Sequence, residues 1–474
     1  MLDQSFSAKN FEIIFNLSNR KGQIKLSDMP DAYQKIVDKL KEAKKQRLEI
    51  IKKKRSNWTE DDTQSYNFLT DEINELQEKK QKCLCEYLTE IAKKINSAQF
   101  QLQLEKHEDT DTGKDVYHIK DDDSKNAYYT IKQLQYNIQR TFKVQQANRH
   151  AILTNIKILL NTKLPLYIIR SDISEFYESI PQKRLLECIS DNTLLSSRSV
   201  SYINGILNAY DIATKQAFDK GKGIPRGVAI SPLLSEIYMR DVDSKIMERQ
   251  EVIFYARYVD DIFIVLTSLN GEETLDRYYN NLKQLFREHE LTLHEIGDKC
   301  KLIDLFPEGK NTIESLTYLG YKLSINKTGR DIITTFSLSD NKKQKIKDRI
   351  DSIFSHFEKQ SKYNVKQARK FLFDALKYIA GNNRLKGAKA GIKIGVYYNN
   401  DLLDSIEELD ALTTYLHDKD INPSQDKFKT KEERDNYIKH IKKAIHKINL
   451  KDNWLNKKMY SLTSDTIIEI QNIL

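Results

Sequence analysis

The sequence is poor in cysteine, proline, glycine and tryptophan, with 4 Cys, 7 Pro, 15 Gly and 2 Trp in 474 residues. So few cysteines exclude a disulfide framework, and Cys83 and Cys85 lack both the spacing and the second pair of a zinc site. No apolar run approaches the roughly 20 residues of a membrane span. The start, MLDQSFSAKNF, lacks the regions of a signal peptide. We therefore expect a cytoplasmic protein with no membrane partner.

The chain is rich in charged residues and in tyrosine. Charged residues make up 31% and hydrophobic residues 39%, which is enough apolar material for a buried core. Lys and Arg number 77 against 68 Asp and Glu, and the net charge of +9 weakly indicates a polyanionic partner. The 25 Tyr can stack on bases or pack at core edges. Composition leaves both roles open.

The spacing of apolar residues divides the chain into a helical region (1–96), a mixed region (97–335) and a second helical region (336–474). In the first, Leu40, Leu69 and Ile73 belong to a pattern that repeats every three or four residues, with Lys and Glu on the other faces. NWTEDD predicts the turn of a helical hairpin with Thr59 as N-cap. A solvated hairpin and an RNA-contacting surface are both open for this region.

The last region contains two clear helical patterns. VKQARKFLFDALKYIA ends at Gly381, which suits a C-terminal cap. In ERDNYIKHIKKAIHKI, isoleucines 438, 441, 445 and 448 share one face, and the other faces carry Lys439, Lys442, Lys443 and Lys447. These lysines are candidates for binding nucleic-acid phosphates, and the alternative is a solvated charged face.

The segment EVIFYARYVDDIFIVLT (251–267) is the most informative. It predicts two strands separated by Asp260 and Asp261, although aspartate is disfavoured in strands and adjacent carboxylates repel each other near a core. A divalent cation removes this conflict, because hard carboxylate oxygens are Mg²⁺ ligands. A solvated hairpin tip is the alternative.

Two further segments carry related signals. LPLYIIRSDISEFYESIP (164–181) predicts a strand ending at Asp172, which is either a helix N-cap or a third carboxylate. Three carboxylates can hold two Mg²⁺ ions about 3.5–4 Å apart for in-line phosphoryl transfer. GKGIPRGVAISPLLSEIYM (221–239) predicts a glycine-rich loop that approaches a ligand closely, followed by a helix from Ser231.

Together, and in this order, these segments resemble the palm of reverse transcriptases. SDISEFY, GIPRGVAISPLLSE and YVDD resemble the first three motifs, LTLHEIGDKCKL (291–302) the fourth, and LTYLGYKL (316–323) the primer grip. RTFKVQQANRHAILTNI (140–156) resembles the fingers strands that hold the incoming triphosphate. The resemblance spans roughly residues 120–335.

The resemblance implies a role for each matching residue. Asp172, Asp260 and Asp261 would be catalytic metal ligands, together with the backbone carbonyl of Ile173, for two Mg²⁺ ions that Mn²⁺ is able to replace. The implied nucleotide-binding residues are Lys143, Arg149, Ser174, Tyr177, Arg226, Gly227 and Lys299, and the implied primer grip is Leu319, Gly320 and Tyr321. Tyr177 falls on the steric gate that selects deoxynucleotides, with core packing as its alternative. Arg226 replaces the usual Gln.

Features that this sequence lacks distinguish it from several branches of the reverse transcriptase family. The last region has no Cys for an intron-type endonuclease and no candidate RNase H carboxylates, and Asn208-Ala209-Tyr210 lacks the His of the retron element. The opening MLDQSFSAKNF, NRKG (19–22), the IPRG-x-x-x-S-P motif and the helical tail are most similar to bacterial antiphage reverse transcriptases, namely the first polymerase of the type 3 systems. That similarity implies a non-coding RNA template, a DNA product and a second reverse transcriptase subunit in a higher oligomer.

We therefore expect an α+β right-hand polymerase of a bacterial cytoplasm. It would have a helical N-terminal extension (1–96), fingers and palm with an antiparallel sheet carrying the YVDD hairpin (97–335), and a helical thumb with a basic C-terminal region (336–474). The expected reaction is RNA-directed DNA synthesis from deoxynucleoside triphosphates. Untemplated or protein-primed DNA synthesis and a non-catalytic RNA-binding scaffold are the alternatives.

Overall fold

The computed structural model describes residues 3–109, 113–120, 124–162, 164, 166–191, 194–214, 221–269, 273–306, 312–328, 331–384 and 392–474. The chain divides into two compact units: unit 1 is Met1–Gln146 with Glu175–Asp241, and unit 2 is Ala147–Ser174 with Val242–Leu474. The fold is mixed α+β, as expected. No helix in the described ranges is long and apolar enough to cross a membrane. The division at residues 96 and 335 stays a prediction.

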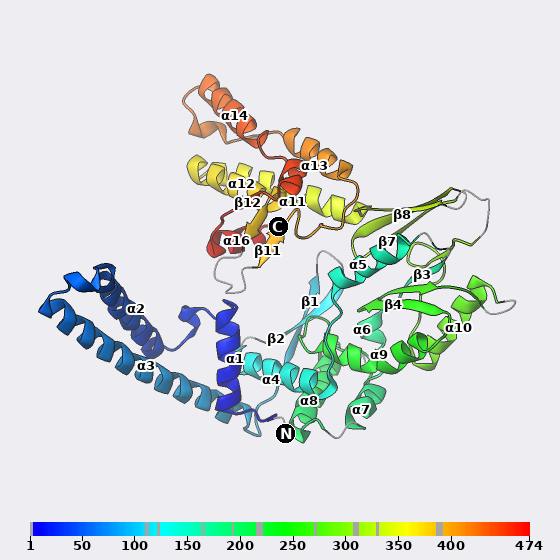
Figure 1. The fold of residues 1–474 in the computed structure, drawn as a ribbon, viewed down its shortest axis with the longest axis horizontal. Helices are drawn as coiled ribbons and strands as arrows, with labels where there is room; N and C mark the ends of the chain where they lie inside the picture. The colour runs from blue at the N-terminus through cyan, green and yellow to red at the C-terminus, as the bar shows by residue number, and fades with distance from the viewer. Residues whose placement is uncertain are drawn as a thin grey trace. The chain divides into compact units, whose positions relative to one another are not determined.

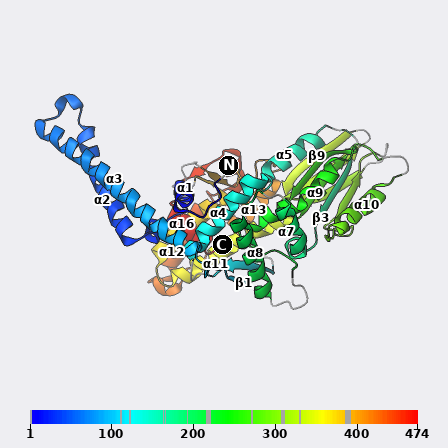
Figure 2. The same cartoon turned by 90° about the horizontal axis from the view of Figure 1, so that it is seen from below.

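Unit 1 begins with a helical hairpin. Its elements are α1 (Ala8–Arg20), η1 (Leu26–Asp28), α2 (Asp31–Lys52), η2 (Arg55–Asn57) and α3 (Glu60–Ile95). Figures 1 and 2 show α2 and α3 side by side, and Leu40 of α2 belongs to one buried cluster with Leu69 and Ile73 of α3. Thr59 caps α3 through a reciprocal capping box with Asp62, both bonds being 3.1 Å. The hairpin and its N-cap are confirmed.

The rest of unit 1 contains a two-stranded antiparallel sheet and shorter helices. They are β1 (Leu104–Asp109), β2 (Lys114–Ile119), α4 (Ser124–Phe142), α6 (Phe176–Ser179), α7 (Gln182–Ser190), α8 (Ser197–Thr214) and α9 (Ser231–Met247), which continues into unit 2. The loop before α9 lies against β2, because Tyr117 N donates to Arg226 O at 2.7 Å. Gly227 has φ +94, and a Cβ there would lie 2.5 Å from Val116 Cγ1. Only glycine fits this approach.

Unit 2 is built on a 4-stranded antiparallel sheet in the order β4–β5–β3–β6. Its strands are β3 (Tyr167–Asp172), β4 (Val252–Tyr258), β5 (Asp261–Leu266) and β6 (Lys301–Asp304). Residues 262–266 of β5 are all buried, which explains their continuous apolar run. Helix α10 (Leu275–Glu288) is tied to β3 by the 2.7 Å hydrogen bond between the hydroxyls of Tyr279 and Ser171.

A second sheet shares a hydrophobic core with the helices that follow it. It contains β7 (Thr312–Tyr318), β8 (Tyr321–Thr328) and β9 (Asp331–Leu338), paired antiparallel in that order. Helix α5 (Arg149–Leu160) contributes Leu153 and Ile156 to this core, and Leu323 and Phe336 come from the sheet. The same core extends into the C-terminal helices, for example through Ile353.

The C-terminal region is mostly helical. It contains α11 (Asp340–Ser361), α12 (Val365–Ala380), β10 (Asn382–Arg384), β11 (Lys393–Gly395), α13 (Glu407–His417), η4 (Gln425–Lys427), α14 (Lys431–Ile445), α15 (Leu450–Leu455), β12 (Met459–Tyr460) and α16 (Ser464–Gln471). The expectation of an all-helical tail is wrong, because β10 pairs antiparallel with β11 and parallel with β12. Strands of two or three residues are too short to show a period in the sequence.

Two details of the predicted C-terminal helices also change. Gly381 follows α12 as expected, but its φ of −122 is extended, so it is not a left-handed cap. Helix α14 ends at Ile445, and Lys447 and Ile448 lie beyond it. The apolar face is nevertheless buried, with Ile441, Ile445 and Ile448 in the main core of unit 2.

The strands expected in residues 140–156 are not formed. Helix α4 ends at Phe142, and α5 begins at Arg149. The side chain of Asn148 caps α5 by accepting from the amides of His150 and Ala151. The buried residues 152, 153, 156 and 160 follow a helical period, so the local pattern overrides the expected strands.

Gly381→Ala should lower the free energy of unfolding by about 1–3 kcal/mol, the usual cost of overpacking. A Cβ at Gly381 would lie 2.2 Å from the ring of Tyr460 and 2.8 Å from Lys377 O. Chemical denaturation measures the change. Gly297→Ala is the matched control, because its Cβ would meet no atom closer than 3.9 Å. Equal stabilities for the two variants would contradict the close packing at Gly381.

Candidate active site

The backbone brings the three predicted carboxylates to neighbouring strand ends. Asp172 is the last residue of β3 and Asp261 the first of β5, and the two are direct partners in the antiparallel register. Partners in such a pair have Cα atoms about 4.5–5.5 Å apart. Ile173 N donates to Asp260 O at 3.0 Å, which fixes the third aspartate beside them.

The tip of the β4–β5 hairpin has a strained backbone, which a hydrogen bond from Arg257 supports. Val259 has φ +60, an unfavourable conformation for a β-branched residue. Arg257 Nη1 donates to Val259 O at 3.0 Å, and the same guanidinium grips Asp243 of α9 at 3.0 and 2.8 Å. The hydroxyl of Tyr255 also donates to Asp243, at 2.6 Å. Asp243 thus fixes the arginine that supports the tip.

The fourth predicted motif runs alongside the first. Ser174 N donates to Thr292 O at 2.8 Å, and His294 N donates to Asp172 O at 3.1 Å. Two side chains of this segment lie near Asp172 Oδ2: Lys299 Nζ and His294 Nε2, each at 3.4 Å. The structure therefore places Lys299 at the first aspartate, in the region that the resemblance implies for it.

Asp261 is in an unfavourable electrostatic environment. The pKa of its carboxyl is raised to about 6, mainly by burial and also by the negative charges of Asp260 and Asp172, against the opposing effect of Arg170. Arg170 Nη2 lies 3.0 Å from Asp261 Oδ1. Three acidic side chains thus meet in a partly buried place, where Arg170 lies beside Asp261 and Lys299 beside Asp172.

These donors fit a divalent cation in chemistry, and the backbone sets them at neighbouring strand ends. Carboxylate oxygens are the ligands that Mg²⁺ takes, and mutual repulsion among Asp172, Asp260 and Asp261 is the condition that a bound cation relieves. In the described part of the chain, however, no three acidic, His or Cys side chains are gathered into a ligand group. Arg170, His294 and Lys299 hold two of the carboxylates instead.

In unit 1, the predicted gate residue and the unusual arginine are neighbours. Tyr177 is buried, and Arg226 Cζ lies 5.1 Å from the centre of its ring. The guanidinium is fixed by Glu178, with Nη2 to Oε1 at 2.9 Å and Nε to Oε1 at 3.2 Å. Ile224 N donates to Tyr177 O at 2.8 Å. Arg226 therefore packs on the tyrosine ring, a place that the sequence did not predict.

Two basic side chains, Arg149 and Lys342, lie next to the predicted primer grip at residues 319–321. Arg149 Nε donates to Leu319 O at 3.0 Å, and Lys342 Cδ lies 3.7 Å from where a Cβ on Gly320 would be. Lys342 Nζ lies 5.0 Å from the ring centre of Tyr321 and 3.4 Å from Asn399 O. Burial, reinforced by the charge of Arg149, lowers the pKa of Lys342 from 10.5 to about 8. Neither cation has a carboxylate partner in the described ranges.

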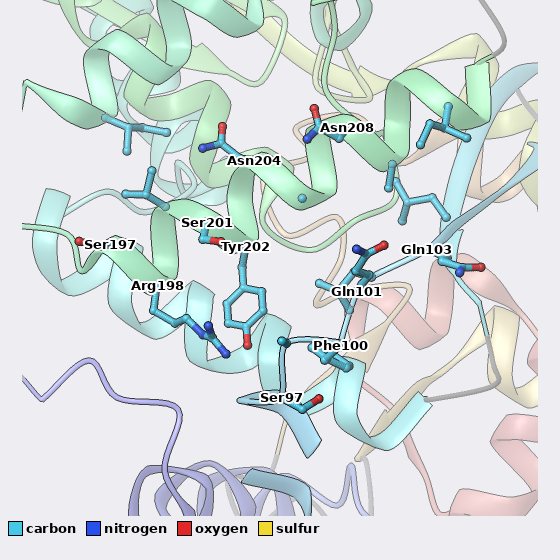
Figure 3. A pocket seen from close by; sticks show the side chains of 18 of the residues that line it. Ser97, Phe100, Gln101, Gln103, Ser197, Arg198, Ser201, Tyr202, Asn204 and Asn208 are labelled. Carbon is cyan, nitrogen blue, oxygen red and sulfur yellow. The ribbon is translucent and has the colours of Figure 1, made fainter. Parts of the chain in front are cut away.

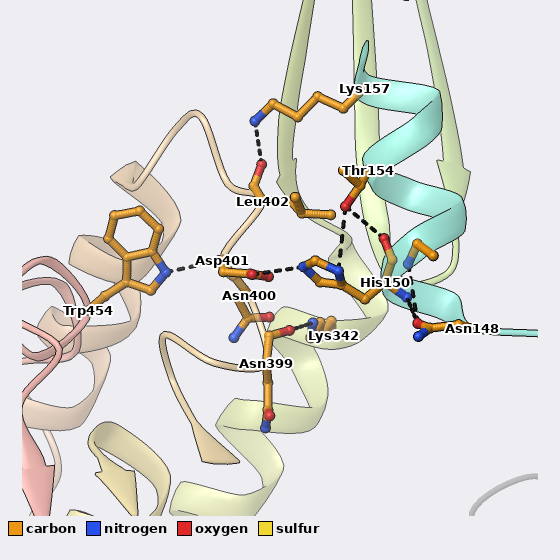
Figure 4. A network of polar contacts seen from close by, with 11 residues as sticks. Asn148, His150, Thr154, Lys157, Lys342, Asn399, Asn400, Asp401, Leu402 and Trp454 are labelled. Atoms are coloured by element: carbon orange, nitrogen blue, oxygen red, sulfur yellow. Dashed lines mark hydrogen bonds and ion pairs between the residues drawn. The ribbon is translucent and has the colours of Figure 1, made fainter. Parts of the chain in front are cut away.

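Helix α5 and the segment 399–404 form the polar network around this turn (Figure 4). His150 Nε2 lies 2.8 Å from Asp401 Oδ2, and Lys157 Nζ donates to Leu402 O at 2.8 Å. Trp454 Nε1 donates to Asn400 O at 3.0 Å. The network holds the segment whose Asn399 carbonyl accepts from Lys342.

The remaining predicted residues lie at the surface. Lys143 is exposed, follows α4 and has φ 52. Lys439, Lys443 and Lys447 are exposed, and Lys442 Nζ lies 3.7 Å from Asp420 Oδ1. Both the solvated-face and the phosphate-binding interpretations of these lysines stay predictions.

Several residues of the site were missed from the sequence. Arg170 lies two positions before Asp172 and therefore on the same strand face, and Arg257 interrupts an apolar strand in the same way. A charge inside a buried strand was the available signal for both. Asp243, His294 and Lys342 gave no such signal, because helix and loop sequences carry many charged residues.

A comparison with family models identifies one family in the chain. Residues 88–323 match the family model described as reverse transcriptase (RNA-dependent DNA polymerase). The chain carries a reverse transcriptase domain. It is thereby classed with the RNA-directed DNA polymerases.

The structure is also similar to solved telomerases, at low identity. Apo telomerase of Candida tropicalis truncated from its C-terminal domain is 14% identical, with a TM-score of 0.33 over 57% of this chain and 70% of that one. Telomerase of Candida albicans with a fragment of telomeric RNA is 12% identical, with a TM-score of 0.34 over 74% and 62%. The latter alignment spans less than two thirds of the telomerase. No curated protein matches the chain in sequence.

Arg257→Met should destabilise the protein by about 3–5 kcal/mol, because it leaves the carboxylate of Asp243 without its buried partner. It also removes the donor to Val259 O. Chemical denaturation measures the loss. Arg287→Met, at an exposed position of α10, is the control and should change stability by no more than about 0.5 kcal/mol. A similarly small change in stability for both variants would contradict a stabilising role of the Arg257–Asp243 ion pair.

Lys342→Met should raise the free energy of unfolding at pH 7, because it removes a buried cation that repels Arg149. In the parent, the folded state releases the lysine proton near pH 8 and the unfolded state only near 10.5. The unfolded state therefore binds more protons between these values, so this lysine makes stability rise with pH there. The variant should lack that rise in urea titrations at pH 7 to 10. The exposed Lys366→Met should keep it.

Proposed function

We propose that the chain is an active RNA-directed DNA polymerase whose catalytic centre is Asp172, Asp260 and Asp261. The observation that carries the proposal is the register of β3 and β5, which sets Asp172 opposite Asp261 with Asp260 bonded to the adjacent Ile173. Fixed carboxylates at strand ends are what a phosphoryl-transfer centre needs, since catalysis there is mostly positioning and charge stabilisation.

The three aspartates and the carbonyl of Ile173 would hold two Mg²⁺ ions, which Mn²⁺ is able to replace. When bound, such a pair supplies activation of the primer hydroxyl and stabilisation of the triphosphate charge. Lys299 and His294, now at Asp172, would be available to the phosphates of the incoming nucleotide. Ser174 and Gly227 offer further contacts, and Tyr177, packed by Arg226, would exclude a ribose 2′-hydroxyl.

At the primer, Leu319, Gly320 and Tyr321 would position the strand, with Arg149 and Lys342 close to its phosphates. Two basic side chains without acidic partners favour a phosphate at this turn. We assign the fingers to the elements around β1 and β2, the palm to the sheet β4–β5–β3–β6 and the thumb to the helices from α11 onward.

The biological setting that we propose is bacterial antiphage defence. The motifs shared with the type 3 systems support it, and they favour a non-coding RNA template and a second reverse transcriptase subunit. Sequencing the nucleic acids that copurify with the protein tests this proposal. One recurrent RNA and its DNA complement are expected, whereas DNA covalently joined to the protein would indicate protein priming.

Asp260→Asn should reduce deoxynucleotide incorporation on a primed RNA template at least about a hundredfold, since it removes a carboxylate that would hold the catalytic cations. The variant keeps the shape of the side chain, so its thermal unfolding should match the parent. Chelating divalent cations should stop the parent enzyme, and added Mg²⁺ should restore it. The exposed Asp298→Asn is the control and should retain activity. Near-parental incorporation by Asp260→Asn would exclude this catalytic centre.

A further inference from the structure

A cavity of about 1140 Å³ lies in unit 1, on residues that the proposed polymerase chemistry does not use. Helix α8 forms one side of it, and residues 97–104, leading into β1, form another (Figure 3). On α8, Ser197, Ser201, Asn204 and Asn208 recur every three or four residues, so they share one helix face. A polar helix face therefore lines the cavity.

Side-chain amides dominate the polar lining. Asn204 and Asn208 come from α8, and Gln101 and Gln103 from the segment before and at the start of β1. Among the described residues, none of these four amides takes part in a hydrogen bond. An amide can donate and accept at once, as base edges require. Four such groups around one cavity are suited to a ligand rich in hydrogen-bonding edges.

The charges of the lining have one sign. Arg198 and Lys120 belong to it, and none of its residues is Asp or Glu. Lys120 Nζ lies 4.0 Å from Glu105 Oε1, and Arg198 Cζ lies 5.3 Å from the ring centre of Tyr202. Phe100 supplies an aromatic ring at the same cavity. Cations, free amides and an aromatic ring together favour a nucleic acid over an acidic or purely apolar ligand.

We propose that this cavity is a binding groove for single-stranded RNA. The amides would contact base edges, which a double helix keeps paired, and Arg198 and Lys120 would contact phosphates. The serine hydroxyls of α8 and the amides can also bond a ribose 2′-hydroxyl, which distinguishes RNA from DNA. The proposal extends the proposed function, on which it rests only for the identity of the RNA, and binding is measurable without any polymerase reaction.

The first test introduces negative charge at unchanged size. Asn204→Asp/Asn208→Asp should weaken equilibrium binding of a labelled single-stranded RNA of mixed sequence by about tenfold or more, as expected for lost base contacts. The control is Asn280→Asp/Asn472→Asp, which adds the same charge at exposed positions of α10 and at the end of α16. Circular dichroism and thermal unfolding show that each variant is folded. Equal affinities for the two double variants would overturn the proposal.

The second test separates phosphate contacts from base contacts. Arg198→Gln/Lys120→Gln should flatten the plot of log affinity against log salt by about 1.4 units, or 0.7 for each lost contact with a single strand. RNA carrying thiouridine should crosslink to residues 97–104 or 197–212 in the parent. Crosslinks confined to other segments, or equal affinity for DNA of the same sequence, would overturn the assignment to RNA. Because none of these measurements needs nucleotide incorporation, an inactive polymerase would leave them interpretable.

Discussion

The repulsion among Asp172, Asp260 and Asp261 is the constraint on which much of unit 2 depends. A sheet that sets carboxylates opposite each other must neutralise them, and the chain does so with Arg170 from the same strand and Lys299 from the fourth motif. Burial of Asp261 makes the charge costlier and raises its pKa. The centre is therefore poised to bind a cation without being held together by one.

The tip of the β4–β5 hairpin also contains an unfavourable feature that neighbouring residues offset. The tip contains a β-branched residue, Val259, in a left-handed conformation, which persists only where surrounding contacts determine it. Arg257 and Asp243 supply those contacts from inside the unit, where their own burial makes the pair expensive to break. The Arg257–Asp243 ion pair thus opposes the backbone strain at Val259. This arrangement sets Asp260 and Asp261 accurately in place.

The sequence predicted the parts whose signals are local. The hairpin 31–96, the N-cap Thr59 and the helix from Ser231 follow from apolar spacing and capping residues, and all are confirmed. The expectation of strands in 140–156 was wrong, because the buried residues 152, 153, 156 and 160 are spaced as in a helix. The sheet formed by β10, β11 and β12 could not be predicted, since β10 pairs with β11 over only three residues and with β12 over two residues that lie 77 positions away.

The groups that the chain leaves unsatisfied are as informative as those it pairs. Surface cations such as Lys53 are matched by nearby acids, here Asp62 at 2.7 Å, and contribute little. Lys342 and Arg149 have no acid, and the amides around Asn204 and Asn208 have no partner in the described chain. Asn204 is half-buried and Asn208 is exposed, so water satisfies both amides until a ligand displaces it. In the two proposals above, a polyanion would bind at one place in each unit, although the net charge of the chain is only +9.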